Sequence, residues 1–290
     1  MEKAKRRRRI ITLVILLAFI LTVGVLLLDS NTRIVTTEYE LFYADLPVAF
    51  DGFRIVLLAD IHVTEFGNDN ERLIRHVRNA QPDVIAIAGD LLCAYGRMPV
   101  DRQLEIAGTL ARGLAAIAPV YFVTGNHEWD RRVGGPWALF DMFAEYGVTV
   151  LRNQYEVITR GGDSIIFAGV DDPHGPADMI TPTQLVERIF TREGEDSFVI
   201  MLEHRNNNLQ LYSQLGVRLV LCGHAHGGIV RLPFTEGLIG PQREWFPTYT
   251  GGVYTRGGTN MVVSRGLGSP IGLRFLNNPQ IVAVTLRAGS

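Results

Sequence analysis

The stretch Leu221-Cys222-Gly223-His224-Ala225-His226-Gly227-Gly228 joins a short apolar run to a glycine and two histidines. Side chains two positions apart in extended backbone point to the same side, so His224 and His226 can face one pocket. Imidazole is the commonest metal ligand among side chains. A single His-x-His pair is a weak signal, so its interpretation as a metal site depends on partners elsewhere in the chain.

Other residues of types that bind metal ions follow the ends of other apolar runs. The residues in question are Asp60 and His62 after 53–59, Asp90 after 83–88, Asn126 and His127 after 120–124, and His204 after 197–202. Taken singly, each has an ordinary interpretation as a cap, a turn residue or a buried histidine. Because the coincidence recurs at five strand ends, we predict a metal site there. Asp171 and Asp172 are interpreted as turn residues, with a role beside the site as the alternative.

The chain alternates between short apolar runs and segments with helical spacing. Strands are predicted at 36–43, 53–59, 83–88, 120–124, 148–151, 156–159, 164–170, 197–202, 218–222, 261–264 and 281–286. Helices are predicted at 70–80, 103–117, 136–146, 181–190 and 208–215. Near-continuous apolar strands between helices are typical of α/β folds with buried sheets. Ligands in such folds gather beyond the carboxyl ends of the strands.

Charge and cysteine content narrow the function classes. The 290 residues carry a net charge of -2, but the first nine alone carry +5, so the remainder carries -7. A nucleic-acid-binding domain usually presents a basic face, and we therefore expect no nucleic-acid partner. Two cysteines, Cys93 and Cys222, are too few for a disulfide framework. We interpret them as buried free thiols.

The N-terminus predicts a membrane anchor. Residues 10–28 contain no charged side chain, and this length just spans the hydrocarbon core of a bilayer as a helix. The basic residues before them should stay in the cytoplasm, which places the rest of the chain on the extracytoplasmic side of the cell membrane. A cleaved signal peptide is the alternative, although no small-residue cleavage site follows residue 28. The Arg8-Arg9 pair also permits twin-arginine export.

The order of the polar blocks resembles the calcineurin-like metallophosphoesterase superfamily. The blocks are Asp-x-His, Gly-Asp, Gly-Asn-His-Glu, a single histidine and Gly-His-x-His. The membrane anchor, the Gly-His-Ala-His-Gly-Gly run and the segment 263–268 are similar to its YkuE/YaeI-like branch of bacterial phosphodiesterases. The residues after His204, Arg205-Asn206-Asn207-Asn208, depart from the family pattern.

The resemblance implies a four-layer αββα sandwich, with two mixed sheets flanked by helices, and a dinuclear metal site. By position, one ion would be held by Asp60, His62 and His226, the second by Asn126, His204 and His224, and both by Asp90. His127 would lie beside the substrate phosphate, and either Glu128 or Asp130 would orient it.

The donor set contains oxygen and nitrogen but no thiolate, which suits Mn, Fe or Zn. Two divalent ions, two aspartates and a hydroxide between the ions would leave a net charge of about +1. Such a site attracts an anionic phosphoester. The hydroxide would attack phosphorus in line, while His127 would donate a proton to the leaving group or stabilise its charge.

We therefore expect a membrane-anchored phosphoesterase that cleaves phosphodiester, phosphomonoester or pyrophosphate bonds, with an envelope or lipid-linked substrate. Cleavage of a UDP-linked acylated sugar, as in lipid A-type synthesis, is the alternative reaction. A catalytically silent binding module is the alternative class. The expected organisation is a basic cytoplasmic tail (1–9), a transmembrane anchor (10–28), a tether with the first strand (29–47) and the catalytic domain (48–290).

Overall fold

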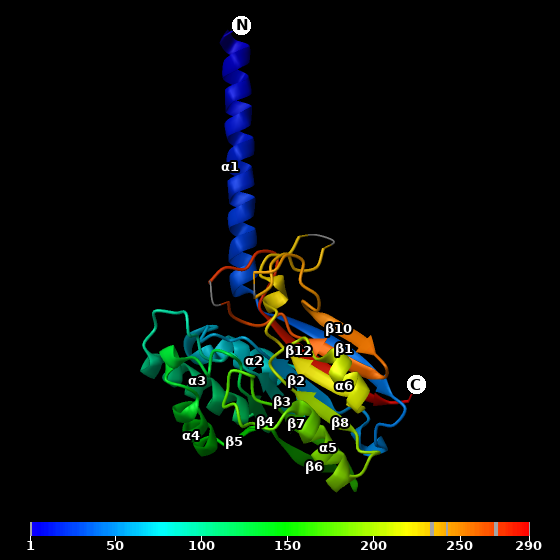
Figure 1. Ribbon diagram of the computed structural model, residues 1–290. Helices are drawn as coiled ribbons and strands as arrows, with labels where there is room; N and C mark the ends of the chain where they lie inside the picture. Colours follow the sequence, from blue (N-terminus) through cyan, green and yellow to red (C-terminus); the bar gives the residue numbers. More distant parts are fainter. Residues whose placement is uncertain (1, 233–234, 242, 270–271, 290) are drawn as a thin grey trace.

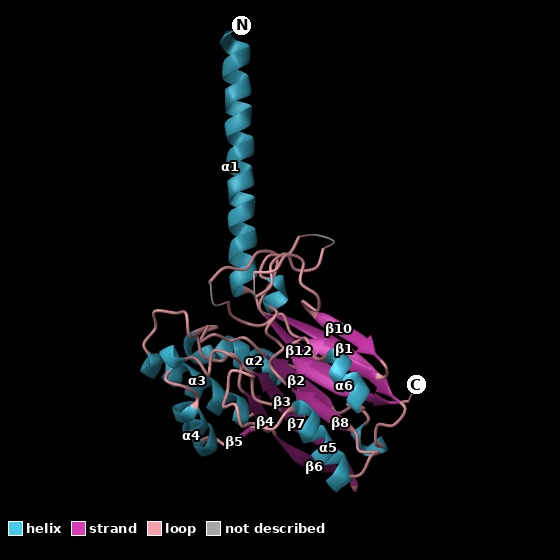
Figure 2. Ribbon diagram, viewed as in Figure 1, coloured by secondary structure: helices cyan, strands magenta, loops and turns pink. Residues whose placement is uncertain are grey.

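The computed structural model describes residues 2–232, 235–241, 243–269 and 272–289. Two six-stranded sheets lie face to face, and helices cover the outer face of each sheet (Figure 1 and Figure 2). This arrangement is the predicted αββα sandwich. One long helix stands apart from it.

The first sheet has the strand order β1-β12-β2-β3-β4-β5. Its strands are β1 (Val35–Tyr43), β12 (Gln280–Ala288), β2 (Arg54–Leu58), β3 (Val84–Ala88), β4 (Val120–Val123) and β5 (Val148–Val150). The strands β2 to β5 are parallel, whereas β12 is antiparallel to β2 and parallel to β1. The outer face packs against α2 (Glu71–Asn79), α3 (Val100–Ala115) and α4 (Trp137–Glu145).

The second sheet has the order β10-β11-β9-β8-β7-β6. Its strands are β10 (Gly252–Arg256), β11 (Thr259–Val263), β9 (Leu219–Cys222), β8 (Val199–Leu202), β7 (Asp163–Gly169) and β6 (Gln154–Arg160). The four inner strands are parallel, and the two edge strands are antiparallel to their neighbours. The outer face packs against α5 (Pro182–Glu193) and α6 (Leu209–Leu215).

Alternation along each inner strand builds the core. In β2, Ile55 and Leu57 point between the two sheets, while Val56 and Leu58 point toward the helices. Side chains of a strand alternate between its two faces, and both faces of this strand are covered. A strand in this position is therefore an unbroken apolar run, as the sequence showed.

Each predicted strand and helix is present, with ends shifted by a few residues. The strand β10 was not predicted, because glycines flank it and most of its residues are only partly buried. Short 3-10 turns that the periodicity did not predict lie at Val48–Phe50, Asn68–Asn70, Arg131–Val133 and His226–Gly228.

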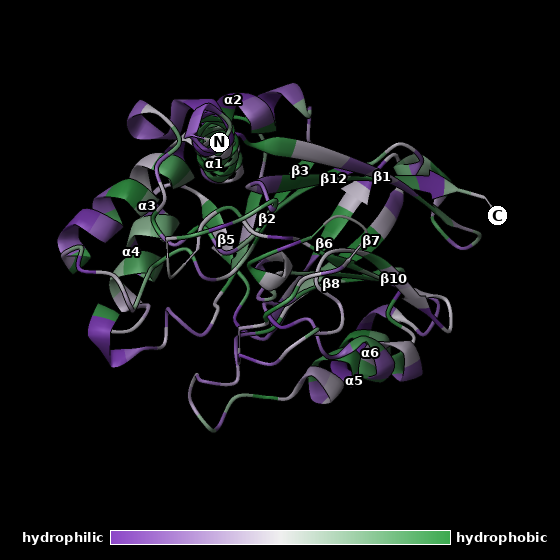
Figure 3. Ribbon diagram, turned by 90° about the horizontal axis from the view of Figure 1, so that it is seen from above, coloured by the Kyte–Doolittle hydropathy of each residue, from purple (hydrophilic) through white to green (hydrophobic). Residues whose placement is uncertain are grey.

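The long helix α1 (Glu2–Thr32) contains the predicted anchor and is long and apolar enough to cross a membrane. Most of its apolar side chains are exposed. Figure 1 shows the helix standing clear of the sandwich, and Figure 3 shows it end-on near α2. Only residues 33–34 separate α1 from β1. The connection between the helix and the first strand is therefore very short.

Candidate metal centre

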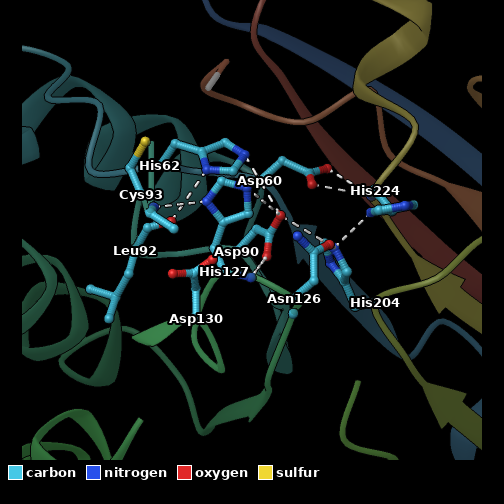
Figure 4. Close-up of polar contacts among 12 residues, drawn as sticks. Asp60, His62, Asp90, Leu92, Cys93, Asn126, His127, Asp130, His204 and His224 are labelled. Atoms are coloured by element: carbon cyan, nitrogen blue, oxygen red, sulfur yellow. Dashed lines mark hydrogen bonds and ion pairs between the residues drawn. The ribbon is translucent and has the colours of Figure 1, made fainter. Parts of the chain in front are cut away.

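The predicted site residues converge because their strands are neighbours. Since β2, β3 and β4 are adjacent and parallel, as are β8 and β9, their carboxyl ends lie at one end of each sheet. The loops beyond these ends meet, and Figure 4 shows the polar side chains that they carry pointing toward one another. Almost all of these side chains are buried.

The first group consists of Asp60, His62, Asp90 and His226, whose candidate donor atoms lie within 4.8 Å of one another. The Nε2 atoms of His62 and His226 are 3.3 Å apart. The Nε2 atom of His226 lies 3.6 Å from Oδ1 of Asp60. This arrangement brings two imidazoles and two carboxylates around one point.

The second group consists of Asp90, His204 and His224, again within 4.8 Å. Nε2 of His204 lies 3.3 Å from Oδ2 of Asp90 and 3.0 Å from Nδ1 of His224. Oδ1 of Asn126 is 3.2 Å from the same Nε2 atom. Asp90 thus belongs to both groups, which are joined through its carboxylate.

Backbone carbonyls set the tautomers of two of these histidines. Nδ1 of His62 lies 3.2 Å from the carbonyl oxygen of Leu92, and Nδ1 of His204 lies 2.8 Å from that of Ala88. A carbonyl oxygen only accepts, so Nδ1 carries the proton in both rings. The Nε2 lone pairs then face the centre of the site, as a metal ligand requires. Nδ1 of His226 is buried without a hydrogen-bond partner among the described residues. The donor set therefore fits two divalent ions.

The charges in the cluster oppose one another. Burial raises the pKa of Asp60 to about 7. Burial alone would lower the pKa of His204, but Asp90 and other carboxylates raise it to about 10. Against the effect of its own burial, His204 and the other histidines hold the pKa of Asp90 well below its usual range. Paired buried carboxylates and inward-facing imidazoles are what a cation site provides.

Glu128 holds two of the site loops together. Its carboxylate accepts hydrogen bonds from the backbone N–H groups of Asp90 (2.9 Å), Leu92 (2.9 Å) and Gly125 (2.7 Å). The side chain is fully buried, and burial together with Asp90 raises its pKa to about 7. Asp130 instead accepts from its neighbour Arg132. Among the described contacts, neither carboxylate hydrogen-bonds to the imidazole of His127.

His127 is oriented by backbone. The N–H of Ala94 donates to Nδ1 of His127 at 2.9 Å, so the proton of the neutral ring is on Nε2. That atom lies 3.9 Å from Oδ2 of Asp90, at the edge of the first group. Burial lowers the pKa of this histidine, which favours the neutral ring. The structure therefore offers Nε2–H as a hydrogen-bond donor beside the site.

An arginine that was not predicted to belong to the site lies beside the second group. Arg205 donates to Asp172 from Nε (2.7 Å) and from Nη2 (3.1 Å), and Nη2 lies 2.9 Å from Nδ1 of His174. Its Nη1 atom is 3.4 Å from Nε2 of His224. Asp172 is buried and holds the guanidinium in place. It also begins a turn, as predicted, because its carboxylate accepts from the N–H of His174 and its carbonyl oxygen accepts from that of Gly175, both at 2.9 Å. Asp171 is also buried and accepts from Thr124 at 2.7 Å.

Arg205 lines several cavities, and two of them also border a predicted histidine ligand. One, of about 280 Å³, lies beside His224 and is lined by Asn206, Pro247 and Tyr249 among others. The other, of about 290 Å³, lies beside His204 and has mostly apolar walls, including Val170, Pro173, Met179 and Ile180. Both open next to the second ligand group.

The segment of the chain that contains these site residues identifies the family. The calcineurin-like phosphoesterase family profile matches residues 53–228, which include every predicted ligand. The chain is a calcineurin-like phosphoesterase. Members of this family are metal-dependent phosphoester hydrolases, and the clustered His and Asp side chains provide the matching candidate metal site.

Relatives of this phosphoesterase match most of its length. The uncharacterized metallophosphoesterase YkuE of Bacillus subtilis (strain 168) is 30% identical over 257 residues, covering 87% of this chain and 85% of YkuE. Phosphodiesterase YaeI of Escherichia coli (strain K12) is 26% identical over 239 residues, covering 81% and 82%. The crystal structure of TT1561 of Thermus thermophilus has a TM-score of 0.49 and 15% identity, covering 75% of this chain and 92% of TT1561.

Several of the predicted ligands of this phosphoesterase have left-handed backbone. The φ angles are 50° for Asp60, 47° for His62, 52° for Asp90, 67° for His224 and 48° for His226. Residues other than glycine reach this region at a cost of about 1–2 kcal/mol each. The strand ends therefore hold their ligands in strained turns, which is common at functional sites.

Glycines allow the strand ends to approach so closely. A Cβ on Gly125 would lie 2.2 Å from Oδ1 of Asp90, and one on Gly223 would lie 2.5 Å from Cβ of Ala59. No real side chain tolerates such distances, so the glycines that precede Asn126 and His224 are required by the geometry.

The two cysteines are buried and free, as predicted. Candidate donor atoms of Cys93, His62 and His127 lie within 4.8 Å of one another. Burial raises the pKa of the Cys93 thiol. The thiol form is therefore favoured, in agreement with a donor set of nitrogen and oxygen.

Proposed function

We propose that this chain is a membrane-anchored phosphodiesterase that uses two divalent metal ions. The observation that carries the proposal is the Asp90 carboxylate shared between two ligand groups. In the proposed assignment, one ion is held by Asp60, His62 and His226, the other by Asn126, His204 and His224, and both by Asp90.

The proposed ions are Mn, Fe or Zn, because all ligand atoms are nitrogen or oxygen. Such ions, when bound, supply Lewis acidity and an activated water for attack on phosphorus. The chain contributes the orientation of the ligands. Backbone carbonyls of Leu92 and Ala88 fix two imidazoles, and Glu128 fixes the loop that carries Asp90.

We assign His127 a role as a neutral hydrogen-bond donor to the phosphoryl group or its leaving oxygen. Its Nδ1 atom already accepts from Ala94. A doubly protonated ring would lose that bond and place two donors against each other. Of the two roles predicted from sequence, this bond therefore favours charge stabilisation over proton transfer.

A diester rather than a monoester is favoured by the surroundings of Arg205. A phosphodiester carries two substituents and one negative charge, and the two cavities beside Arg205 offer a place for each substituent. The guanidinium, held by Asp172, can bind a non-bridging phosphate oxygen between them. The relative YaeI is named a phosphodiesterase, which is consistent with this choice.

The proposed organisation keeps the catalytic domain at the membrane. Residues 1–9 form a basic cytoplasmic tail, 10–28 cross the bilayer, 29–47 contain the tether and the first strand, and 48–290 form an extracytoplasmic catalytic domain. The orientation follows from the basic N-terminal cluster. Support for an envelope or lipid-linked substrate comes from the loops around the metal-ligand ends of the strands, which Figure 1 shows beside the foot of α1.

The test uses the full chain in detergent micelles. Metal content is measured by mass spectrometry, and hydrolysis of bis(p-nitrophenyl) phosphate is followed with added Mn. We expect about two ions per chain in the wild type and loss of both ions and activity in Asp90→Ala. The control Asp141→Asn changes an exposed carboxyl on α4 and should behave as the wild type. Full activity in Asp90→Ala would overturn the dinuclear assignment.

The assignment of His127 has its own test. In His127→Ala we expect both ions to remain and turnover to fall by roughly 10²–10³-fold, as for the loss of one donor to a developing charge. His127→Gln, whose amide can donate in place of Nε2–H, should recover part of this loss. Unchanged turnover in His127→Ala would count against the assigned role.

A further inference from the structure

The C-terminal end of α1 is held to the catalytic domain by hydrogen bonds and is not joined to it by a flexible tether. Nδ2 of Asn31 donates to the carbonyl oxygen of Arg274 at 2.9 Å, and the N–H of Arg274 donates back to Oδ1 of Asn31 at 3.0 Å. The N–H of Leu276 donates to Oγ of Ser30 at 2.8 Å, and Nδ2 of Asn278 donates to the carbonyl oxygen of Asp29 at 2.8 Å. The segment 274–278 is thus fixed against α1.

These bonds set the depth of the domain relative to a bilayer. The apolar run of α1 ends at Leu28, and Asn31 follows three residues later. At 1.5 Å per residue this is a rise of about 4.5 Å. The polar interface on each side of the hydrocarbon core is roughly 5–7 Å thick. If α1 spans the bilayer, the loop bonded to Asn31 lies within the interfacial region.

Exposed apolar side chains gather on the loops at this end of the domain. We define the loop surface as Leu232, Trp245, Phe246 and Leu273, whose exposed fractions are 43%, 70%, 70% and 46%. Their loops are joined by isolated β-bridges, Val230 to Phe275 and Ile239 to Trp245. Figure 1 shows these loops, yellow to red, surrounding the foot of α1.

We propose that the loop surface inserts into the interfacial region of the bilayer that holds α1, and this inference rests on the proposed anchoring. The surface is continuous with the anchor through the bond between Asn31 and Arg274. Aromatic residues with an apolar body are enriched at membrane–water interfaces. A protein partner is disfavoured, because the loop surface lies at the depth of the lipid headgroups when α1 spans the bilayer.

The contact has a consequence for the metal centre. Asn277, within the fixed segment, donates from Nδ2 to the carbonyl oxygens of His226 (2.7 Å) and Ile229 (3.2 Å). The loop that carries His226 is therefore braced by the segment that the membrane positions. The domain is held with its ligand-bearing loops facing the headgroups, so that a phosphodiester in the headgroup layer can reach the site without leaving the bilayer.

The test uses the full chain in vesicles of phosphatidylethanolamine and phosphatidylglycerol, with or without lipid brominated on its acyl chains. Bromine quenches tryptophan that lies at or below the headgroups. The chain has three tryptophans, so the emission of Trp245 is obtained as the difference between the wild type and Trp245→Phe. The matched control is the difference for Trp137→Phe. Trp137 is 53% exposed and begins α4, which lies away from the foot of α1 in Figure 1.

We expect the Trp245 component to fall by at least about two-fold in brominated vesicles, as for an interfacial tryptophan, and the Trp137 component to stay unchanged. Flotation of the protein with the vesicles after an alkaline wash shows separately whether α1 is inserted in the bilayer. Protein that floats without quenching of Trp245 would overturn the loop contact and leave the anchor standing. Protein that does not float would overturn both.

Discussion

Replacement of Glu128 by glutamine tests whether this carboxylate ties the metal-binding loops together. Its two oxygens accept three backbone N–H bonds, from Asp90, Leu92 and Gly125. In Glu128→Gln the amide oxygen can still serve Asp90 and Gly125, but the amide nitrogen then meets the N–H of Leu92 as a second donor. One hydrogen bond to a charged acceptor is lost and a buried donor is left without a partner.

Loss of a hydrogen bond to a charged group costs about 1.5–3 kcal/mol, and an unsatisfied buried donor adds to this. We expect the free energy of unfolding to fall by roughly 2–4 kcal/mol. For a domain of this size the midpoint of thermal unfolding should drop by roughly 5–15 °C. Because Asp90 and Asn126 lie on the two loops, the affinity for Mn should also fall by about 10–100-fold, as is typical for residues that support ligands.

The assay is thermal unfolding followed by near-UV circular dichroism at about pH 8, above the pKa of about 7 that burial gives Glu128, together with Mn titration. Asp130→Asn is the matched control. Asp130 makes its side-chain bonds to Arg132 and is partly exposed, so its replacement should change stability by less than about 1 kcal/mol. Equal midpoints and Mn affinities for Glu128→Gln and the wild type would refute the reasoning.

Three further outcomes are expected. Arg205→Ala should raise KM for the diester by roughly 10–100-fold, the value of a hydrogen bond to a charged group, with unchanged metal content; an unchanged KM would remove Arg205 from substrate binding. His224→Ala and His226→Ala should each lose one ion, and the two variants should lose different ions. Each single variant should therefore bind about one Mn per chain, and the double variant should bind almost none. Retention of one ion in the double variant would contradict this assignment. Burial raises the pKa of Glu203 to about 8 from an ordinary value of 4.5. Between these pH values the folded chain binds more protons than the unfolded chain, so the free energy of unfolding falls as pH rises through that range. Glu203→Gln should make this fall in unfolding midpoint shallower but not abolish it, because the raised pKa values of Asp60 and Glu128 also contribute; parallel pH curves for the two proteins would disprove it.

The layers and the place of the site were predictable from local pattern. Continuous apolar runs such as 53–59 identified strands buried on both faces, and polar residues at their ends pointed to the carboxyl end of parallel strands. The sheet order was not predictable, since the return of β12 between β1 and β2 depends on pairing across the whole chain. The resemblance, not the periodicity, supplied the sandwich.

The polar groups around the site escaped prediction because their partners are distant in sequence. In the sequence, Arg205 is one of several polar loop residues. Its role becomes evident only from its hydrogen bonds to Asp172, which is 33 positions away. Glu128 was considered as an orienting residue for His127, but its carboxylate reaches backbone N–H groups that no side-chain pattern reveals. The bonds from Asn31 to Arg274 likewise join segments 243 positions apart.

The left-handed turns at the strand ends have a consequence for engineering and for sequence evolution. Glycine would relieve about 1–2 kcal/mol of backbone strain at each of positions 60, 62, 90, 224 and 226. At positions 60 and 90 this gain is offset, because the buried N–H groups of His224 and His127 would lose their acceptors. A screen that rewards heat resistance alone therefore favours glycine at 62, 224 and 226 over the native histidines and selects against activity. A library meant to improve this enzyme should hold these five positions fixed. By the same logic, a natural relative that carries glycine at several of them is marked as one in which catalysis is no longer under selection.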